Sequence, residues 1–151
     1  MKKTLTIMFS MLVFLVLLTA CTIQQNQNIY DNQNKILKLD DYKTYEALEG
    51  GVEENNAYIS FKAYDGIDTL FVFSGSQTVT ITVYEYVTDG RFKIVLIDPY
   101  NNIRELRETT RVETVEGQYK IKVVGDHASG TVSINVNSQV AVSFYPLSNK
   151  D

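Results

Sequence analysis

The chain has few of the residues on which covalent cross-links and reactive sites depend. Its 151 residues include one cysteine, one histidine, two prolines and no tryptophan. A single cysteine excludes an intramolecular disulfide and a zinc site built on cysteines. A transition-metal site would have to depend on carboxylates. Stability must therefore come from a hydrophobic core, and the 44% hydrophobic content is that of a folded globular domain.

Positive charge is also scarce. The 14 basic side chains face 18 acidic ones, for a net charge of −4. Lys2 and Lys3 are the only charged residues among the first twenty, so taking these two away leaves 12 basic and 18 acidic side chains, a net charge of −6, in residues 21–151. This balance argues against a nucleic-acid partner. It also disfavours electrostatic docking onto anionic lipid, so membrane attachment needs another source.

Signatures of catalysis are missing from the sequence. The single histidine, His127, lies between Gly125 and Gly130, with Asp126 beside it and Ser129 nearby. A catalytic triad needs a nucleophile, a base and an orienting acid that converge in a pocket, which neighbouring loop residues do not provide. The glycines lie between expected strands and not before a helix, so no phosphate-binding loop is predicted. We expect no enzyme activity and a solvated histidine in a turn.

The first twenty-one residues have a distinct composition. A short basic start, Met1–Lys3, precedes sixteen uncharged residues, Leu5–Ala20. A membrane-spanning helix usually needs about 20 apolar residues, whereas this length suits the apolar section of a secretory signal. The stretch ends in Leu18-Thr19-Ala20-Cys21, an aliphatic residue and two small residues before the cysteine. The alternative is an uncleaved N-terminal helix with a buried cysteine.

This ending resembles the lipobox of bacterial lipoproteins. The resemblance implies that the thiol of Cys21 receives a diacylglyceryl group and that the signal is cut before it. Two acyl chains supply the stable anchoring that a single chain does not. The resemblance therefore implies an extracytoplasmic protein attached to a bacterial membrane by its lipid, with no other cofactor expected.

The remaining chain divides by composition. Thr22–Asn34 is rich in glutamine and asparagine and poor in apolar residues, as in a polar tether. The segment that follows fits either a short amphipathic helix, from apolar residues at spacing three, or a strand. The boundaries that we predict are a signal peptide at 1–20, a lipidated tether at 21–34, the ambiguous segment at 35–49, one folded domain at 50–147 and a tail at 148–151.

The folded domain shows the alternation of β-strands. In Thr78–Thr88, valine and isoleucine alternate with threonine and tyrosine, so one side is apolar and the other amphipathic. Similar alternation recurs in several later and earlier segments, at the spacing expected of a sandwich or barrel. We predict an all-β fold, a single antiparallel β-sandwich of jelly-roll or immunoglobulin-like type with seven to eight strands. A closed barrel is the alternative.

Turn-forming residues separate these segments. Asp65-Gly66, Asp89-Gly90 and the stretch from Gly125 to Gly130 are predicted as connections between strands, because aspartate and glycine suit positive backbone dihedrals. Asp98-Pro99-Tyr100-Asn101-Asn102 is predicted as a further turn.

The order of expected strands and turns in residues 78–137 resembles that of a second group of proteins. The stretches GRFKIVLIDPYNN and VEGQYKIKVVGDHASGTVSINV are similar to small β-sandwich modules of bacterial secreted proteins, among them pre-peptidase C-terminal domains. The resemblance rests on strand layout and carries no site residues. It implies a non-catalytic binding or accessory module.

Two sets of residues are candidates for a site. Tyr84 and Tyr86 lie on the expected outer face of their strand, where tyrosine beside threonine suits a polymer or protein partner. The alternative is a second packed face, and without tryptophan the residue most used for stacking on sugars is missing. Four aspartates at predicted loops could supply oxygen ligands to calcium, although their spacing matches no dedicated calcium loop. These are Asp65, Asp68, Asp98 and Asp126.

The sequence therefore favours a lipid-anchored, non-catalytic binding module for an envelope polymer or a protein partner. An accessory subunit of a membrane complex is the first alternative. A hydrolase that depends on loop carboxylates is the second.

Overall fold

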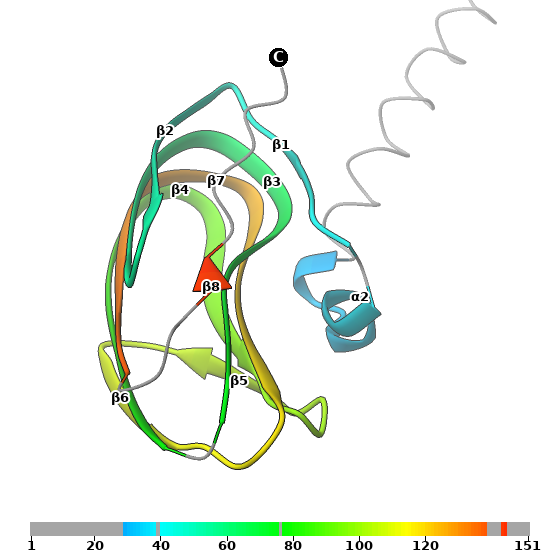
Figure 1. Cartoon of the computed structure of the whole chain (residues 1–151). Helices are drawn as coiled ribbons and strands as arrows, with labels where there is room; N and C mark the ends of the chain where they lie inside the picture. Colours follow the sequence, from blue (N-terminus) through cyan, green and yellow to red (C-terminus); the bar gives the residue numbers. More distant parts are fainter. Residues whose placement is uncertain (1–28, 39, 76, 139–142, 145–151) are drawn as a thin grey trace, which may run out of the picture.

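The computed structural model describes residues 29–38, 40–75, 77–138 and 143–144 (Figure 1). The predicted signal peptide, Cys21 and the C-terminal tail at 148–151 lie outside these residues. In the described part of the chain, no helix has the length and apolar character that crossing a membrane requires.

The prediction of an all-β, antiparallel fold is confirmed. Within the described residues, eight strands form one sheet in the order β1-β3-β7-β4-β5, with β2 and β8 paired to β3 and β6 paired to β4. Every pairing is antiparallel. The elements are α2 (Gln33–Lys38), β1 (Tyr42–Thr44), β2 (Ala47–Glu53), β3 (Asn56–Ser74), β4 (Thr78–Ile97), β5 (Ile103–Leu106), β6 (Thr109–Glu113), β7 (Gln118–Asn137) and β8 (Ser143–Phe144).

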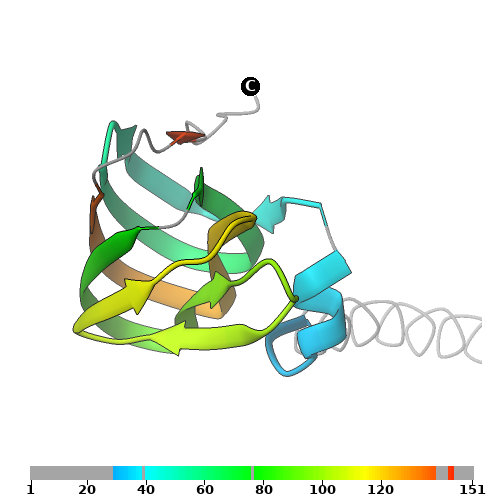
Figure 2. The ribbon, with the colours of Figure 1, turned by 60° about the horizontal axis from the view of Figure 1, so that its bottom comes forward.

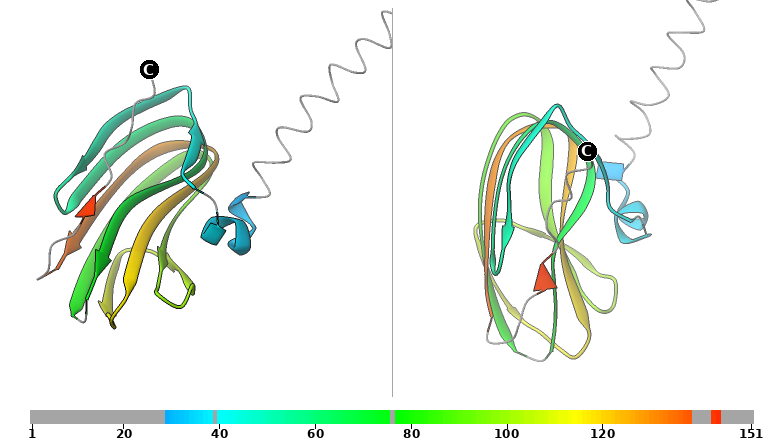
Figure 3. Two further views of the ribbon diagram at one scale, coloured as in Figure 1. Left: turned by 45° about the vertical axis from the view of Figure 1, so that its right-hand side comes forward. Right: turned by 45° about the horizontal axis from the view of Figure 1, so that its top comes forward.

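The sheet bends back on itself, so that its two halves face each other as the layers of a sandwich (Figures 1 and 3). The strands β3, β4 and β7 have 19 or 20 residues each and pass through both layers. Layer A consists of β2, β6 and residues 56–62, 78–87 and 128–137. Layer B consists of β1, β5, β8 and residues 64–74, 91–97 and 118–126. Among the described residues no pairing joins the two outer edges, so the sheet is open and not a closed barrel.

Three of the predicted turns are wrong. Asp65-Gly66, Asp89-Gly90 and the stretch from Gly125 to Gly130 lie inside β3, β4 and β7, where the sheet bends. The pairing register shifts near the first two sites, as it does at β-bulges. Some bulges use the same left-handed backbone as a tight hairpin turn, and Gly90 (φ 69°) and His127 (φ 51°) adopt it. Aspartate and glycine therefore fit the local backbone at these three sites, but the chain does not reverse its direction at any of them.

The predicted turn at Asp98 does connect two strands. The backbone N–H of Asn101 donates to the carbonyl of Asp98 at 3.0 Å, and the chain passes from β4 to β5.

The main core lies between the two layers, as the alternation predicted. Val79, Ile81 and Val83 are at most 4% exposed. Near the bend, Phe61 of layer A stacks on Phe92 of layer B with ring centroids 4.4 Å apart. Figure 2 shows the same two layers from another side. Burial of these side chains between the layers supplies the stability that no disulfide provides.

A second core covers the outer face of layer B. Ile29 and Ile36 are buried against this face, and α2 lies along it (Figures 1 and 3). Their partners on the sheet are Ile67, Val95, Ile97 and Val124. The described end of the predicted tether, residues 29–34, therefore lies against the sheet. The segment that the sequence left open, 35–49, contains most of α2, all of β1 and the start of β2.

Candidate binding surfaces

The outer face of layer A carries an array of nine uncharged side chains, which we call the tyrosine face. The burial of the residues between them, such as Ile59, Val83 and Ile134, turns these nine toward the outside of the sandwich. The members of the tyrosine face are Asn56, Tyr58, Ser60, Thr82, Tyr84, Tyr86, Thr131, Ser133 and Asn135.

The strand register arranges this array in three rows across β3, β7 and β4. In the central row Ser133 is paired with Tyr58 on one side and with Tyr84 on the other. In a second row Thr131 is paired with Ser60 and Tyr86, and in a third Asn135 is paired with Asn56 and Thr82. Each row therefore has a small or amide side chain on the central strand between two flanking residues.

Three tyrosines dominate the exposed area of the tyrosine face. Tyr58, Tyr84 and Tyr86 are 59%, 72% and 70% exposed. Because neighbouring strands are about 4.8 Å apart, Tyr58 and Tyr84 stand roughly 10 Å from each other across Ser133. Two aromatic rings thus flank a strip of hydroxyl groups, a surface with both apolar faces and hydrogen-bonding groups.

Uncharged polar groups connect the array at its edge. The side-chain amide of Asn135 donates to Oδ1 of Asn56 at 2.8 Å. The hydroxyl of Thr109, on β6, lies 3.4 Å from that of Thr82. Charged residues lie on the neighbouring strands, for example Arg111 on β6, which keeps the centre of the face neutral.

Sequence reasoning located Tyr84 and Tyr86 but missed Tyr58. The outward direction of Tyr58 could have been predicted. It precedes Ile59 in an alternating segment, so the two side chains must point to opposite faces of the strand. What the sequence does not contain is the pairing of β3 and β4 with β7, which brings residues about 25 positions apart into one row.

No protein-family model matches this chain, and no curated protein matches it. The interpretation of its surfaces therefore depends on their own chemistry.

A second group of polar residues lies at the bend of the sheet. The backbone N–H of His127 donates to Oδ1 of Asp65 at 2.7 Å, and its Nδ1 lies 3.0 Å from Oδ1 of Asp126. The guanidinium of Arg91 donates to Oδ2 of Asp126 at 2.6 Å and to Asp31 at 3.0 Å. Three strands and the N-terminal segment are thereby joined at one point, which we call the bend cluster.

The charges in the bend cluster stabilise one another. The hydrogen bond to Asp126 raises the pKa of His127, and the nearby Asp65 acts in the same direction. Burial raises the pKa of Asp126, but the hydrogen bonds from His127 and Arg91 outweigh it and hold that pKa below its usual range. Ligand atoms of Asp65, Asp126 and His127 lie within 4.8 Å of one another. Because Arg91 already neutralises Asp126, these contacts are those of an ion-pair network.

The four aspartates considered for calcium do not converge. Asp65 and Asp126 meet in the bend cluster, whereas Asp68 pairs with Lys43 of β1 in the interior. The carboxylate of Asp98 accepts hydrogen bonds from its own turn, including one from the backbone N–H of Asn102 at 2.8 Å. Asp126 is paired with Arg91 of β4, and six residues of β4 lie between Arg91 and Asp98. At the rise of a strand this places Asp98 roughly 20 Å from Asp126.

The bend cluster predicts a pH dependence of stability. Because the folded-state pKa of His127 is raised, its contribution is complete below the unfolded value of about 6.5 and is lost as the pH rises through the folded value. We expect His127→Asn to destabilise the fold more at about pH 5.5 than at about pH 8.5. The difference should stay below about 1 kcal/mol because the imidazole is half exposed.

Urea unfolding of both proteins at the two pH values measures this difference. Asparagine is the suitable replacement because it tolerates the positive φ of this position. Asp126, with its lowered pKa, would weaken the fold only at pH values below about 4, outside the chosen window. An effect of the same size at both pH values would contradict a contribution from the imidazolium charge.

Proposed function

We propose that this protein is a lipid-anchored, extracytoplasmic lipoprotein of a bacterial membrane that binds a partner without catalysis. The partner is an envelope polymer or another protein, and the tyrosine face is its binding surface. The lipid is the diacylglyceryl group on Cys21.

The observation that carries this proposal is the contrast between the two outer faces of the sandwich. The outer face of layer B has an apolar cluster that the N-terminal segment covers. The centre of the outer face of layer A, on β3, β7 and β4, is polar and uncharged and has three exposed tyrosines. Tyrosine offers a large contact area at a low cost in side-chain entropy, which is why it is enriched in binding surfaces.

The alternatives have less support. A hydrolase would need carboxylates that meet in a pocket, but Asp98 is far from Asp126, and Asp126 is held by Arg91. An accessory subunit that only docks would favour a flat apolar patch, whereas the tyrosines here alternate with serine, threonine and asparagine.

The N-terminal segment limits how far the domain stands from the membrane. Seven residues lie between Cys21 and Ile29, which is packed on layer B. At about 3.5 Å per residue, the chain from Cys21 to Ile29 reaches at most roughly 28 Å. An anchored domain would therefore bind partners close to the membrane surface.

Substitution of the three tyrosines tests the proposal. In a variant with Tyr58→Ser, Tyr84→Ser and Tyr86→Ser, we expect cosedimentation with isolated envelope polymer, or crosslinking in native membranes, to fall at least about tenfold, because buried aromatic anchors dominate binding energies. Thermal unfolding should hardly change, because surface substitutions usually alter stability by no more than about 0.5 kcal/mol.

Tyr100→Ser is the matched control for this variant. Tyr100 is 73% exposed, as the face tyrosines are, but it lies in the turn after β4. Unchanged binding in the control and lost binding in the triple variant would support the proposal. Unfolding of the triple variant would mean that the face is structural, and equal losses in both would mean that binding uses no particular face.

A further inference from the structure

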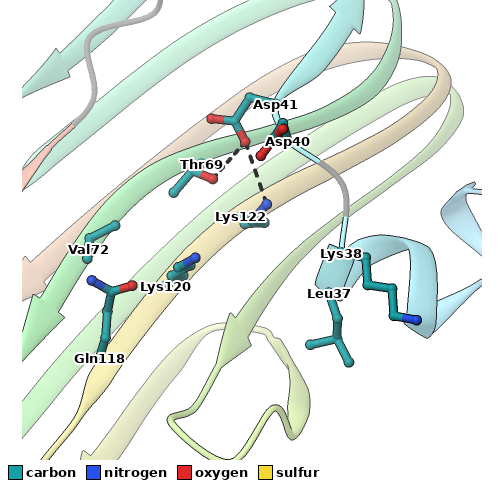
Figure 4. A pocket seen from close by; sticks show the side chains of 9 residues that line it. All are labelled: Leu37, Lys38, Asp40, Asp41, Thr69, Val72, Gln118, Lys120 and Lys122. Carbon is teal, nitrogen blue, oxygen red and sulfur yellow. Dashed lines mark hydrogen bonds and ion pairs between the residues drawn. The ribbon is translucent and has the colours of Figure 1, made fainter.

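A polar cavity lies beside α2 on the outer face of layer B (Figure 4). Its volume is about 340 Å³, at the small end of the range for small-molecule sites. The polar side chains around it are Lys38, Asp40, Asp41, Gln118, Lys120 and Lys122. Three lysines and two aspartates give this cavity a local charge opposite to that of the protein as a whole.

Two of these lysines project from the central strand of the sheet. Lys120 and Lys122 are two residues apart on β7, so they lie on the same face roughly 7 Å from each other. Lys122 is paired across the sheet with Thr69 and Val95, neither of which is acidic. The floor of the cavity therefore presents two ammonium groups side by side.

The carboxylates belong to one wall of the cavity. Asp41 lies between α2 and β1, and its Oδ1 is 3.6 Å from Nζ of Lys122. The same oxygen accepts a hydrogen bond from the hydroxyl of Thr69 at 2.7 Å. Figure 4 shows Asp40 and Asp41 together at one end, with Lys120 and Gln118 farther along β7. The end of the floor near Lys120 is therefore the more positive one.

Burial disfavours the charged form of Lys122. This residue is 4% exposed, and burial lowers the pKa of its ammonium group, although Asp41 acts in the opposite direction. The neighbouring charge of Lys120 lowers that pKa further. An anion between the two ammonium groups would favour the charged form of both.

We propose that this cavity binds a phosphate group, held by the ammonium groups of Lys120 and Lys122. Gln118 offers a side-chain amide as a further donor at the same end of the floor. Lysine binds phosphate as a concentrated positive charge, and the cavity leaves room for a small organic group attached to the phosphate. The phosphate can belong to a soluble ester or to an anionic lipid head group. The proposal does not depend on the lipid anchor or on the tyrosine face.

A titration with inorganic phosphate tests the cavity itself. The full chain carrying Cys21→Ser, in a neutral detergent, is titrated with phosphate at constant ionic strength, with chloride as the exchanged ion. We expect saturable shifts in the amide NMR signals of Thr69, Lys120 and Lys122. Lys120→Gln should weaken binding at least about tenfold, because it removes one of two charge-assisted hydrogen bonds.

Lys62→Gln is the matched control, because Lys62 is an exposed lysine of β3 in layer A. Its phosphate affinity should equal that of the parent chain. Lys120→Gln is preferred to a change at Lys122 because Lys120 is only half buried, so its loss should not unfold the protein. Signals at β7 that do not respond to phosphate, or equal losses in Lys120→Gln and Lys62→Gln, would overturn the proposal.

Vesicles distinguish the two sources of phosphate. The same chains are sedimented with vesicles of phosphatidylglycerol and of phosphatidylcholine. Because the apolar residues 5–20 are present in every chain, the excess of binding to phosphatidylglycerol over phosphatidylcholine is the measured quantity. An excess that Lys120→Gln removes would identify a lipid head group as the ligand, whereas phosphate binding with equal sedimentation on both vesicles would identify a soluble phosphate ester.

Discussion

Replacing Gly130 by alanine should destabilise the fold by about 3 kcal/mol, which is a large part of the 5–15 kcal/mol typical of a small domain. Gly130 lies on β7 at the bend, paired with Phe61 on one side and Val87 on the other. Its φ of 156° is in a region that residues with a side chain rarely adopt. A Cβ at this position would lie 2.2 Å from the carbonyl oxygen of Tyr86 and 2.9 Å from Cα of Val87.

This clash cannot be relieved by a side-chain rotation. The atoms that a Cβ would meet belong to the backbone of β4, so relief requires β4 and β7 to move apart at the bend. Tyr86 belongs to this part of β4. On the other side of β7, Gly130 is paired with Phe61 of β3, whose ring stacks in the core. Loss of hydrogen bonding and of core packing should therefore occur together.

Gly51→Ala is the control for this prediction. Gly51 also lies in a strand of layer A, but a Cβ there would meet nothing within 4 Å. Urea unfolding should show little change for Gly51→Ala and a clearly lower midpoint for Gly130→Ala. Equal midpoints for the two variants would mean that the bend accepts a side chain and is not fixed by this glycine.

Replacing Cys21 by serine should abolish lipid attachment completely. The thiol is the group that the lipobox resemblance assigns to acylation, and a serine hydroxyl is a far weaker nucleophile than a thiolate. Each buried methylene of an acyl chain contributes about 0.8 kcal/mol to membrane binding, so the loss of two chains removes the stable anchor. Incorporation of labelled fatty acid on expression in a bacterium, followed by gel electrophoresis, measures the effect.

Thr22→Ala is the control for Cys21→Ser. It changes the residue after the cysteine and leaves the thiol in place, so its labelling should equal that of the parent chain. The serine variant should run as the uncleaved precursor without label. Labelled fatty acid on the serine variant would contradict lipidation at this cysteine.

The strands and their buried sides could be predicted from the sequence because alternation is a local property. Val79, Ile81 and Val83 occupy every second position, and all three are buried in the structure. The antiparallel character of the pairing follows from the same pattern, since no long helical segment separates the strands in the described part of the chain.

The bends could not be predicted in the same way. Asp89-Gly90 has the composition of a hairpin turn, and the local backbone at Gly90 is indeed left-handed. Whether the chain reverses there or continues as a bulged strand depends on its partners, and those are far away in the sequence. Strands of about 20 residues are also much longer than the usual five or six, so shorter strands joined by turns were the more probable expectation.

The candidate surfaces depend on contacts between residues that are far apart in the sequence. The outward direction of Tyr84 follows from alternation, whereas its place in a row with Tyr58 follows only from the register on β7. The polar cavity beside α2 forms because Asp40 and Asp41, just before β1, lie close to Lys120 and Lys122 of β7. The composition around Asp40 and Asp41 does not predict this contact. The sequence places Ile29 in a tether because its neighbours are polar, yet Ile29 and Ile36 together pack the segment against layer B.

The continuity of β3, β4 and β7 through both layers has a mechanical consequence. The N-terminal segment is packed on the layer B halves of these strands, and the tyrosines project from the layer A halves of two of them. If a membrane anchor pulled on the domain while a partner held the tyrosine face, the load would first act on the packing of the N-terminal segment against layer B. From there it would pass to layer A along the continuous backbones of β3, β4 and β7, so the force would not depend on contacts between the two layers alone.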